Sequence, residues 1–278
     1  MKFDIIGSIV TYKSSPNELR RAINSFVNTD LKIKLYVIDN SPSDDLKNLC
    51  NHYEKVEYIF TKSNIGFGSA HNLAMNKELN NAKYHLVLNP DVFFDSGVLE
   101  ELYEFMEKNK SVGLTIPKIL YPNGDTQYSC KLLPTPLDLL IRRFAPFKKY
   151  VKKRNDKYEL RFTGYDKIFE APCLSGCFMF VRYKSLREVG LFDNRYFMYL
   201  EDFDLSRRVH KEYDTIFYPK VEIYHEYEKG SYKRTNLLWY HIKSAIKYFN
   251  KWGWFFDRER KRVNDNILNK LGYYNIKY

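Results

Sequence analysis

The stretch Ile5–Asn40, IIGSIVTYKSSPNELRRAINSFVNTDLKIKLYVIDN, contains the pattern that decides the fold. It opens on a short apolar run, Ile5–Val10, and closes on a second, Leu35–Ile38. Between them, Asn17–Val27 places apolar residues on one face at helical spacing, after the start signal Ser-Ser-Pro. Short buried strands joined by a helix favour a parallel sheet. This stretch therefore predicts a strand–helix–strand unit.

The same alternation continues to about residue 110, which predicts a Rossmann-like α/β half-domain. The expected strands there are Val56–Phe60 and Tyr84–Leu88, and the expected helices are Ser69–Leu79 and Leu99–Asn109. The second half is less regular. Its expected elements are strands at Leu114–Lys118, Gln127–Cys130 and Cys177–Arg182, a helix at Asp202–Lys211, and a helical segment at Thr235–Phe256.

Composition restricts the class of protein but does not choose its partner. The 278 residues are 44% hydrophobic, with 12 glycines and 10 prolines, which excludes wholesale disorder and low-complexity sequence. The length fits one or two domains. A net charge of +11 with 24 Tyr and 20 Phe suits nucleic acid, an anionic membrane or a phosphate-rich substrate.

Cysteine spacing and hydropathy predict where the chain works. Cys50, Cys130, Cys173 and Cys177 lack redox or zinc spacing and are expected to be buried free thiols. The N-terminus has no signal-peptide pattern, and no apolar run reaches 18 residues. We therefore expect a cytoplasmic protein, either free or bound peripherally at the inner face of the cell membrane.

Three of the expected strands end in polar residues: Thr11-Tyr12, Asp39-Asn40 and Asn89-Pro90-Asp91. Each is a common turn by itself, but ligands of open α/β sheets bind at the carboxyl ends of strands. Together they predict a nucleotide pocket, in which Asp39 accepts hydrogen bonds from a base or ribose. Asp91 offers the hard oxygen ligands that Mg²⁺ or Mn²⁺ prefers.

Two further segments have alternative interpretations. The loop Asn64-Ile-Gly-Phe-Gly68 is either a phosphate-binding loop or a strand-to-helix turn that needs glycine. The segment Phe197–Arg208, FMYLEDFDLSRR, holds three carboxylates at an expected helix start. They either cap the helix dipole or form a catalytic set, with Asp204 and Arg208 paired at i, i+4 to hold the turn rigid.

A set of motifs in fixed order resembles the family 2 inverting glycosyltransferases of GT-A fold, in their rhamnosyltransferase-like branch. The motifs are Asp39-Asn40-Ser41, Asn64-x-Gly66-Phe67-Gly68-x-x-x-Asn72, Asn89-Pro90-Asp91, Ser175-Gly176-Cys-Phe-Met, Gly190-Leu-Phe-Asp193 and Glu201-Asp202-x-Asp204-x-x-x-Arg208. The resemblance implies a mostly parallel central sheet flanked by helices. It implies a GT-A domain over 1–231, with a nucleotide-binding half at 1–110 and an acceptor and catalytic half at 111–231, followed by a helical extension at 232–278.

The resemblance also implies roles for single residues. Asp202 matches the catalytic base, beside Glu201, with Asp204 and Arg208 supporting the turn. Asp91 matches the last residue of the metal motif, which here begins with Asn89, and His225 matches a second metal ligand or is a packed residue. The residues implied to bind the nucleotide sugar are Thr11, Tyr12, Asp39, Asn40, Asn64, Gly66, Gly68, Asn72 and Asn89.

The implied reaction is inverting transfer of L-rhamnose from dTDP-rhamnose, with Mg²⁺ or Mn²⁺, onto a hydroxyl of a lipid-linked bacterial surface glycan such as O-antigen or capsule. UDP-hexose or galactofuranose donors are the alternatives within the family. From outside enzymology, a basic nucleic-acid-binding protein is the rival, but we find no zinc, RNP or helix-turn-helix signature and expect no nucleic acid partner.

Two segments are candidates for a membrane contact. One is the basic stretch Arg142–Arg161 and the other is the helix near Thr235–Phe256. That helix carries an apolar stripe (Leu238, Trp239, Ile242, Ala245, Ile246 and Phe249), with Lys243, Lys247 and Lys251 on another side. It is either an interfacial helix or one packed on the catalytic domain or on the second subunit of a homodimer.

Overall fold

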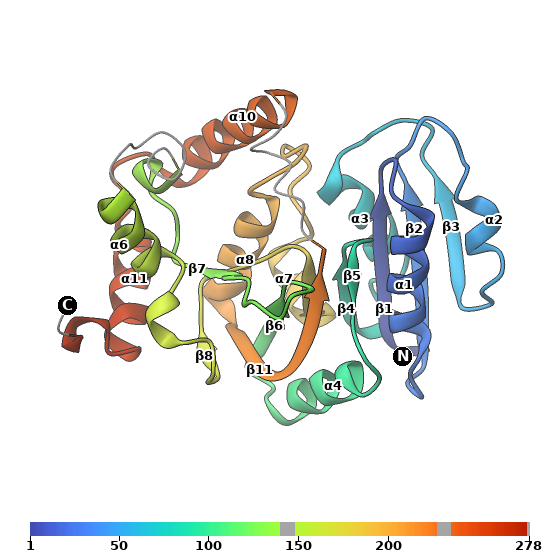
Figure 1. The fold of residues 1–278 in the computed structure, drawn as a ribbon, viewed down its shortest axis with the longest axis horizontal. Coiled ribbons are helices and arrows are strands. Elements are labelled where there is room, and N and C mark those ends of the chain that lie inside the picture. Colours follow the sequence, from blue (N-terminus) through green and yellow to red (C-terminus); the bar gives the residue numbers. More distant parts are fainter. Residues whose placement is uncertain (140–147, 227–234, 277–278) are drawn as a thin grey trace.

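The computed structural model of the protein describes residues 1–139, 148–226 and 235–276 (Figure 1). The described strands form a nine-stranded sheet and a separate two-stranded pair. Across the large sheet the order is β3 (Val56–Phe60), β2 (Ile33–Asp39), β1 (Phe3–Thr11), β4 (Ala82–Leu88), β10 (Phe178–Arg182), β6 (Val112–Leu120), β11 (Asp214–His225) and β5 (Val92–Phe93), with β8 (Phe169–Glu170) paired to β11. The separate pair is β7 (Cys130–Lys131) with β9 (Cys173–Leu174).

The large sheet combines two parallel blocks. Strands β3, β2, β1 and β4 run parallel, as do β6 and β11, and β10 joins the two blocks by antiparallel pairing to β4 and β6. The carboxyl ends of β1, β2 and β4 therefore meet at one edge, as the sequence predicts.

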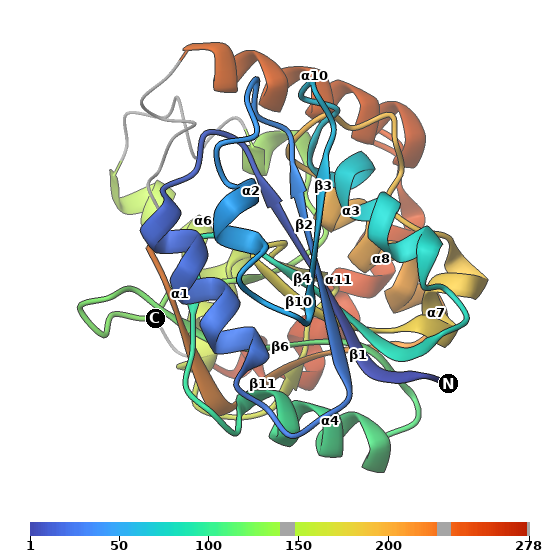
Figure 2. The ribbon, with the colours of Figure 1, turned by 90° about the vertical axis from the view of Figure 1, so that its right-hand side faces the viewer.

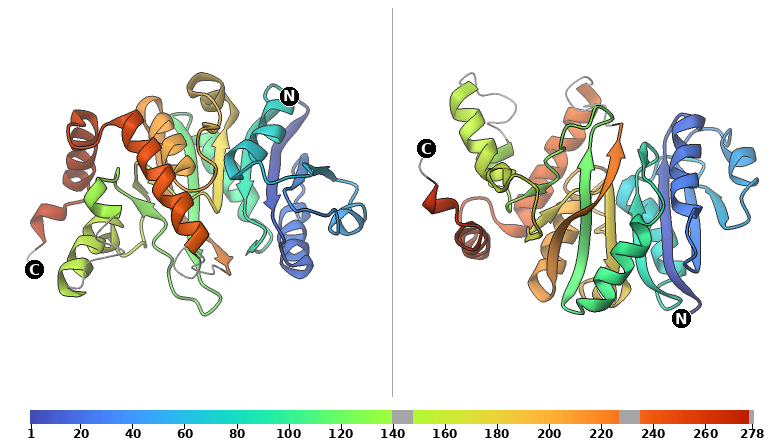
Figure 3. Two further views of the ribbon diagram at one scale, coloured as in Figure 1. Left: turned by 90° about the horizontal axis from the view of Figure 1, so that it is seen from above. Right: turned by 60° about the horizontal axis from the view of Figure 1, so that its bottom comes forward.

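Helices cover both faces of this sheet. They are α1 (Pro16–Val27), α2 (Lys47–Cys50), α3 (Phe67–Lys77), α4 (Val98–Lys108), α6 (Lys148–Tyr158), α7 (Tyr183–Val189), α8 (Glu201–Glu212), α10 (Thr235–Trp252) and α11 (Arg258–Lys270), with the 3₁₀ helices η1 (Arg161–Thr163) and η2 (Tyr273–Asn275). Figure 2 shows α1 and α3 on opposite sides of β1. Helices α2 and α11 lie at opposite ends of the molecule (Figure 3).

The first strand–helix–strand unit shows why the sequence folds this way. Helix α1 begins with Pro16 at its first turn and buries Leu19, Ala22, Ile23 and Phe26 completely. Phe26 packs so closely on β1 that a Cβ at Gly7 would lie 2.6 Å from its ring. Truncation of such a buried ring to alanine costs about 3–5 kcal/mol of folding free energy.

A buried polar chain links β1, α3 and β4 beneath the strand ends. The hydroxyl of Ser8 lies 2.6 Å from Nδ1 of His71 and 2.7 Å from Nε2 of His85, and all three side chains are fully buried. Burial lowers the pKa of His85 to about 3 and that of His71 well below its ordinary value. Both imidazoles are therefore neutral in the folded protein.

The structure corrects several expected boundaries. The strand expected over Gln127–Cys130 is reduced to β7, which begins at Cys130, and the Gln127 side-chain amide donates to the carbonyl of His225 at 2.7 Å. Helix α10 ends at Trp252 rather than Phe256, because Gly253 adopts φ +100. The four cysteines are buried and free, as predicted.

Parts of two predictions lie outside the described residues. Residues 140–147, with Arg142 and Arg143, belong to the basic stretch, whose remainder enters α6 and η1. The expected boundary between 231 and 232 also falls outside them. Across the described ranges, no helix is both long and apolar enough to cross a membrane.

Helix α10 packs on the segment that leads into α8, which corrects the predicted stripe. Tyr248 and Phe249 are buried against Tyr196 and Leu200, whereas Trp239 and Ile246 are exposed. Lys251 also lies on the inner side, where it pairs with Asp193 and Asp204. The inner face of α10 is therefore part of the folded domain.

Candidate active site

A cavity of about 660 Å³ lies between the strand ends of the first half and the start of α8. Its volume is in the range that holds small-molecule ligands. The predicted site residues that line it are Thr11, Tyr12, Asn40, Asn64, Asn89, Asp91, Glu201, Asp202 and His225. The structure thus brings together most of the residues that the motifs single out.

One wall of the cavity is formed by residues at the ends of β1 and β2 and by the loop after β3. Asn40 donates to the carbonyl of Gly66 at 3.3 Å, and Asn64 Oδ1 accepts from the Gly66 amide at 3.0 Å. The Thr11 hydroxyl is buried and has no hydrogen-bond partner among the described residues. Tyr12 is half exposed beside it. These groups can receive the polar atoms of a ligand.

Asp39 lies behind this wall and does not line the cavity. Its Oδ1 accepts from the Ser41 amide at 2.9 Å and its Oδ2 accepts from the Tyr58 hydroxyl at 2.7 Å. The carboxylate is fully buried and shapes the end of β2. Its predicted hydrogen bond to a base or ribose stays a prediction.

Gly66, Gly68 and Asn72 also lie away from the cavity. Gly66 has φ +90, and a Cβ there would lie 2.5 Å from the carbonyl oxygen of Phe197. A Cβ at Gly68 would lie 2.9 Å from Phe192, whose carbonyl accepts from Asn72 at 2.8 Å. The glycine loop forms a strand-to-helix turn that packs on the segment that precedes Glu201, and its predicted contact with the nucleotide sugar stays a prediction.

Asp91 and His225 meet at the cavity because β5 pairs with the end of β11, with His225 opposite Val92. Asp91 Oδ1 lies 3.4 Å from His225 Nε2, and Gln127 Oε1 lies 3.0 Å from His225 Nδ1 and orients the ring. Asp91 Oδ1 is buried without a hydrogen-bond partner among the described residues. The carboxylate oxygen of Asp91 suits Mg²⁺ or Mn²⁺, and an imidazole nitrogen beside it suits a transition-metal ion such as Mn²⁺ better than Mg²⁺.

The two residues do not form a complete metal cage. In the described part of the chain, no cluster of three or more His, Cys, Asp or Glu side chains is arranged to hold a metal. A divalent cation on Asp91 and His225 would therefore take its remaining ligands from water or from the phosphates of a bound nucleotide, as Mg²⁺ commonly does.

The opposite wall begins at the first turn of α8. Asp202 Oδ2 accepts from the Gly176 amide at 2.9 Å, and Oδ1 accepts from the Phe203 amide at 2.9 Å. Burial raises the pKa of Asp202, although these amides oppose the shift. Burial and the nearby charge of Asp202 raise the pKa of Glu201 to about 8. The negative charge of one carboxyl therefore disfavours ionisation of the other.

The chain enters this wall through a strained turn. Tyr199 and Leu200 both have left-handed backbones, with φ +70 and φ +66. Such conformations cost about 1–3 kcal/mol each in residues other than glycine, and they persist only where surrounding contacts hold them.

Those contacts centre on Asp204, which is fully buried. Its Oδ2 pairs with Nε of Arg208 at 2.8 Å, as the i, i+4 spacing predicts. Its Oδ1 accepts from Lys251 at 2.7 Å and from the Trp252 indole at 2.8 Å. The Arg208 guanidinium also donates to the carbonyls of residues 189, 190 and 191. Helix α10 thus completes the support of the turn that leads into α8.

The cavity side chains that sequence reasoning missed include Lys131, Tyr158, Tyr199 and His241. Tyr199 lies in the aromatic stretch before Glu201, and Lys131 directly follows an expected strand, so both carried a weak signal. The charge of Lys131 partly offsets the upward pKa shift of Asp202. His241 and Tyr158 carried no signal, because α10 and α6 bring them in from distant parts of the chain.

With this geometry in place, comparison with known families identifies the protein. The description "Glycosyl transferase family 2" matches residues 8–190. The chain belongs to glycosyl transferase family 2. The matched range contains Asp91 and Gly176 but ends before Glu201 and before the whole of α10.

Curated relatives extend beyond that range. This glycosyltransferase is 27% identical over 235 residues to the N-acetylglucosaminyl-diphospho-decaprenol L-rhamnosyltransferase of Mycobacterium tuberculosis, covering 78% of this chain and 74% of the relative. It is 24% identical over 272 residues to the rhamnosyltransferase WbbL of Escherichia coli, covering 93% and 94%. It is also 25% identical over 211 residues to the low-salt glycan biosynthesis hexosyltransferase Agl10 of Haloferax volcanii, covering 75% and 62%.

Solved structures bear out the expected GT-A fold. GalNAc-T7, solved with UDP, GalNAc and Mn²⁺, superposes with a TM-score of 0.65 at 15% identity over 90% of this chain. The chain spans about half of that protein, with 48% covered. Residues 1–349 of S. aureus TarS superpose with a TM-score of 0.54 at 13% identity, over 80% of this chain and 60% of that one.

Proposed function

We propose that this glycosyltransferase is an inverting rhamnosyltransferase, which transfers L-rhamnose from dTDP-L-rhamnose to a hydroxyl of a lipid-linked glycan. The observation that carries the proposal is the cavity itself, which has Thr11, Asn40 and Asp91 on one wall and Asp202 on the other. The names of the mycobacterial and Escherichia coli relatives support rhamnose as the sugar. The mycobacterial name supports an acceptor on a polyprenyl diphosphate, as in the assembly of bacterial surface glycans.

Asp202 is the base of the proposed reaction. As the acceptor oxygen attacks the anomeric carbon, the bond to the donor phosphate breaks and the hydroxyl proton passes to the Asp202 carboxylate. One displacement of this kind inverts the anomeric centre and needs no protein nucleophile. The amides of Gly176 and Phe203 hold the carboxylate in place, and the raised pKa brings the base closer to a working pH near neutral.

Asp91 and His225 are the residues that would hold a divalent cation. When bound, Mg²⁺ or Mn²⁺ supplies charge neutralisation for a departing diphosphate. The chain's own contribution at this point is to orient the two ligands, through the Gln127 contact and the β5–β11 pairing.

A donor screen tests the proposal. The purified protein is incubated with dTDP-rhamnose, UDP-glucose, UDP-galactofuranose or GDP-mannose and a synthetic polyprenyl-diphosphate glycan, and the released nucleotide is measured. We expect dTDP release that depends on the acceptor and is lost in Asp202→Asn. Release of UDP alone would contradict the rhamnose assignment and would favour the hexosyltransferase alternative.

A second measurement tests the alternative that the protein binds nucleic acid. Binding of a labelled RNA or DNA to a basic protein falls steeply with salt. We expect only weak, salt-labile binding that dTDP-rhamnose does not displace. Tight binding to nucleic acid that persists at high salt, without acceptor-dependent transfer, would overturn the proposed function.

A further inference from the structure

The turn between α10 and α11 holds three consecutive aromatic residues at the surface. The exposed fractions are 38% for Trp254, 78% for Phe255 and 98% for Phe256. Among the described residues, no large apolar side chain is more exposed than that of Phe256. Single exposed apolar residues are ordinary, but adjacent exposed rings mark a surface that contacts a partner. We call Trp254–Phe256 the aromatic turn.

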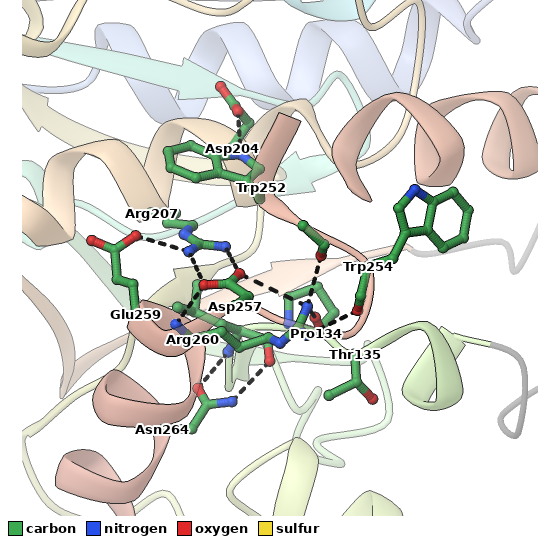
Figure 4. Close-up of polar contacts among 12 residues, drawn as sticks. Pro134, Thr135, Asp204, Arg207, Trp252, Trp254, Asp257, Glu259, Arg260 and Asn264 are labelled. Atoms are coloured by element: carbon green, nitrogen blue, oxygen red, sulfur yellow. Dashed lines mark hydrogen bonds and ion pairs between the residues drawn. The ribbon is translucent and has the colours of Figure 1, made fainter. Parts of the chain in front are cut away.

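Buried charges hold the aromatic turn in one shape (Figure 4). Arg260 donates to the carbonyls of Gly253 and Trp254 at 3.2 and 3.0 Å. Asp257 caps α11 by accepting a hydrogen bond from the Arg260 amide. It also accepts hydrogen bonds from the two terminal guanidinium nitrogens of Arg207, at 2.8 and 2.9 Å. Because Arg207, Asp257 and Arg260 are almost fully buried, the turn beneath the exposed rings is preorganised.

The surface around the aromatic turn is cationic. The side chains of Arg258 and Lys261 are exposed, and neither has an ion-pair partner within the residues that the structure describes. Asp257 and Glu259, the acidic residues on either side of Arg258, both pair with Arg207, and Asp265 follows Lys261 by four residues along the same groove. An anion that approaches this surface therefore meets two exposed cations that Asp257 and Glu259 do not neutralise.

A groove of about 460 Å³ runs between the aromatic turn and α6. Its lining has Phe255 and Phe256 on one side and Tyr158 on the other, with five cationic side chains against three acidic ones. Tyr158 also lines the active-site cavity, so the groove and the cavity are neighbours. A partner held at the aromatic turn would therefore lie next to the transfer site.

We propose that the aromatic turn is a docking surface for an anionic lipid bilayer. Phe255 and Phe256 enter the boundary between headgroups and acyl chains, and Arg258 and Lys261 bind lipid phosphates. Apolar rings beside exposed cations fit a bilayer better than a protein surface. The rings match the acyl chains and the cations match the lipid phosphates, and both lie within a few residues of each other. The surface lies outside the transfer site, so the inference is independent of which sugar is transferred.

Vesicle flotation tests this proposal. The full-length protein is mixed with phosphatidylcholine vesicles that contain or lack phosphatidylglycerol, and the bound fraction is measured. We expect binding only to the anionic vesicles. The double variant Phe255→Ser/Phe256→Ser should bind at least about tenfold more weakly, because two ring insertions are lost. Arg258→Gln/Lys261→Gln should bind about tenfold more weakly and lose most of the salt dependence.

The matched control is Leu73→Ser/Ile168→Ser, which removes exposed apolar side chains from other elements and should bind like the wild type. Melting temperatures of all variants check the fold, and the arginine–lysine variant tests the surface if the phenylalanine variant is unstable. Wild-type protein that does not float, or variants that float equally well, would overturn the proposal. So would a dimer that the phenylalanine variant dissociates with no change in flotation, which would assign the surface to a second copy.

Discussion

One wall of the cavity lies at the ends of three strands and contains Thr11, Asn40 and Asp91. The opposite wall contains Glu201 and Asp202, at the start of a helix that follows two residues with left-handed backbone. We call these the nucleotide wall and the catalytic wall. In the nucleotide wall, Asn40 bonds to Gly66 within the first half, and Asp91 meets His225, which lies at the end of a strand of the same sheet. In the catalytic wall they reach far along the chain, from Asp204 to Trp252 and from Met198 to Ser244.

The difference shows which part of the enzyme can be exchanged independently. The nucleotide wall is set mainly by the strand ends, with the Gly66 loop packed on Phe197. The catalytic wall needs α10, which lies outside the range that matches the family description. Helix α10 therefore supports the proposed catalytic turn, although it contributes few atoms to the cavity.

The largest effect on turnover is expected from a substitution in the catalytic wall alone. Asp202→Asn removes the proposed base but keeps the shape of the side chain, so turnover should fall by about 10²–10⁴ while affinity for dTDP changes little. Steady-state rates and calorimetric titration with dTDP measure the two quantities. Glu201→Gln is the matched control and should have a smaller effect; the reverse order would move the base to Glu201.

The next largest effect, on nucleotide affinity, is expected from a substitution in the nucleotide wall alone. Asp91→Asn should weaken the Mn²⁺-dependent part of dTDP binding by at least about tenfold, because a carboxylate ligand is lost. Calorimetric titration with and without MnCl₂ provides a readout that does not depend on turnover. Asp95→Asn, an exposed neighbour, should behave like wild type. Equal dTDP affinity of the wild type in EDTA and in MnCl₂ would contradict the metal assignment.

A third effect separates the two walls by pH. His71 and His85 remain neutral in the folded protein, whereas the unfolded chain protonates them below about pH 6.5. The unfolded state then binds more protons, so the free energy of unfolding should fall with pH below 6.5, by about 1.4 kcal/mol per pH unit for each histidine. Asp193 of the catalytic side has a lowered pKa, because Lys251 and Arg195 outweigh its burial, and it stays ionised in this range.

Urea unfolding between pH 7 and about pH 5 measures this slope. His85→Gln should reduce the slope by up to about 1.4 kcal/mol per pH unit, whereas His52→Gln, an exposed histidine, should not change it. A His85→Gln slope equal to that of the wild type would show that the buried imidazole accepts a proton without unfolding.

The smallest effect tests how α10 supports the catalytic wall. Lys251→Met removes one of the partners of the buried Asp204 carboxylate and should lower the free energy of unfolding by about 1–2 kcal/mol. It should also lower kcat while leaving the KM for the donor almost unchanged. Lys247→Met, which loses a single contact to the backbone at residue 195, is the control and should stay within about 0.5 kcal/mol of wild type.

The sequence predicts the nucleotide wall better than the catalytic wall, for a physical reason. Strand ends are encoded locally, so Thr11, Asn40 and Asp91 could be placed from apolar runs and the polar residues that follow them. The pairing of Asp204 with Arg208 was also predictable, because helical spacing fixes it. The roles of Lys251 and Trp252 were not, because tertiary packing alone determines which face of α10 meets the catalytic turn.

Asp39 and Asn72 show the limit of motif reasoning within the nucleotide half. Both occur in the motifs, yet their polar atoms bond to the protein's own Ser41, Tyr58 and Phe192. A motif identifies residues that a family needs, but it does not separate those that touch a ligand from those that hold the wall.

The order of these contacts along the chain bears on how the protein is made. During synthesis the ribosome releases Asp91 and then Asp202 well before Ser244, Lys251 and Trp252, which fix the left-handed turn at Tyr199 and Leu200. A nascent chain that has reached α8 can already form its strand ends, but its catalytic turn is not yet set. A chain that ends before α10 would lack the contacts from Ser244, Lys251 and Trp252 that fix this turn.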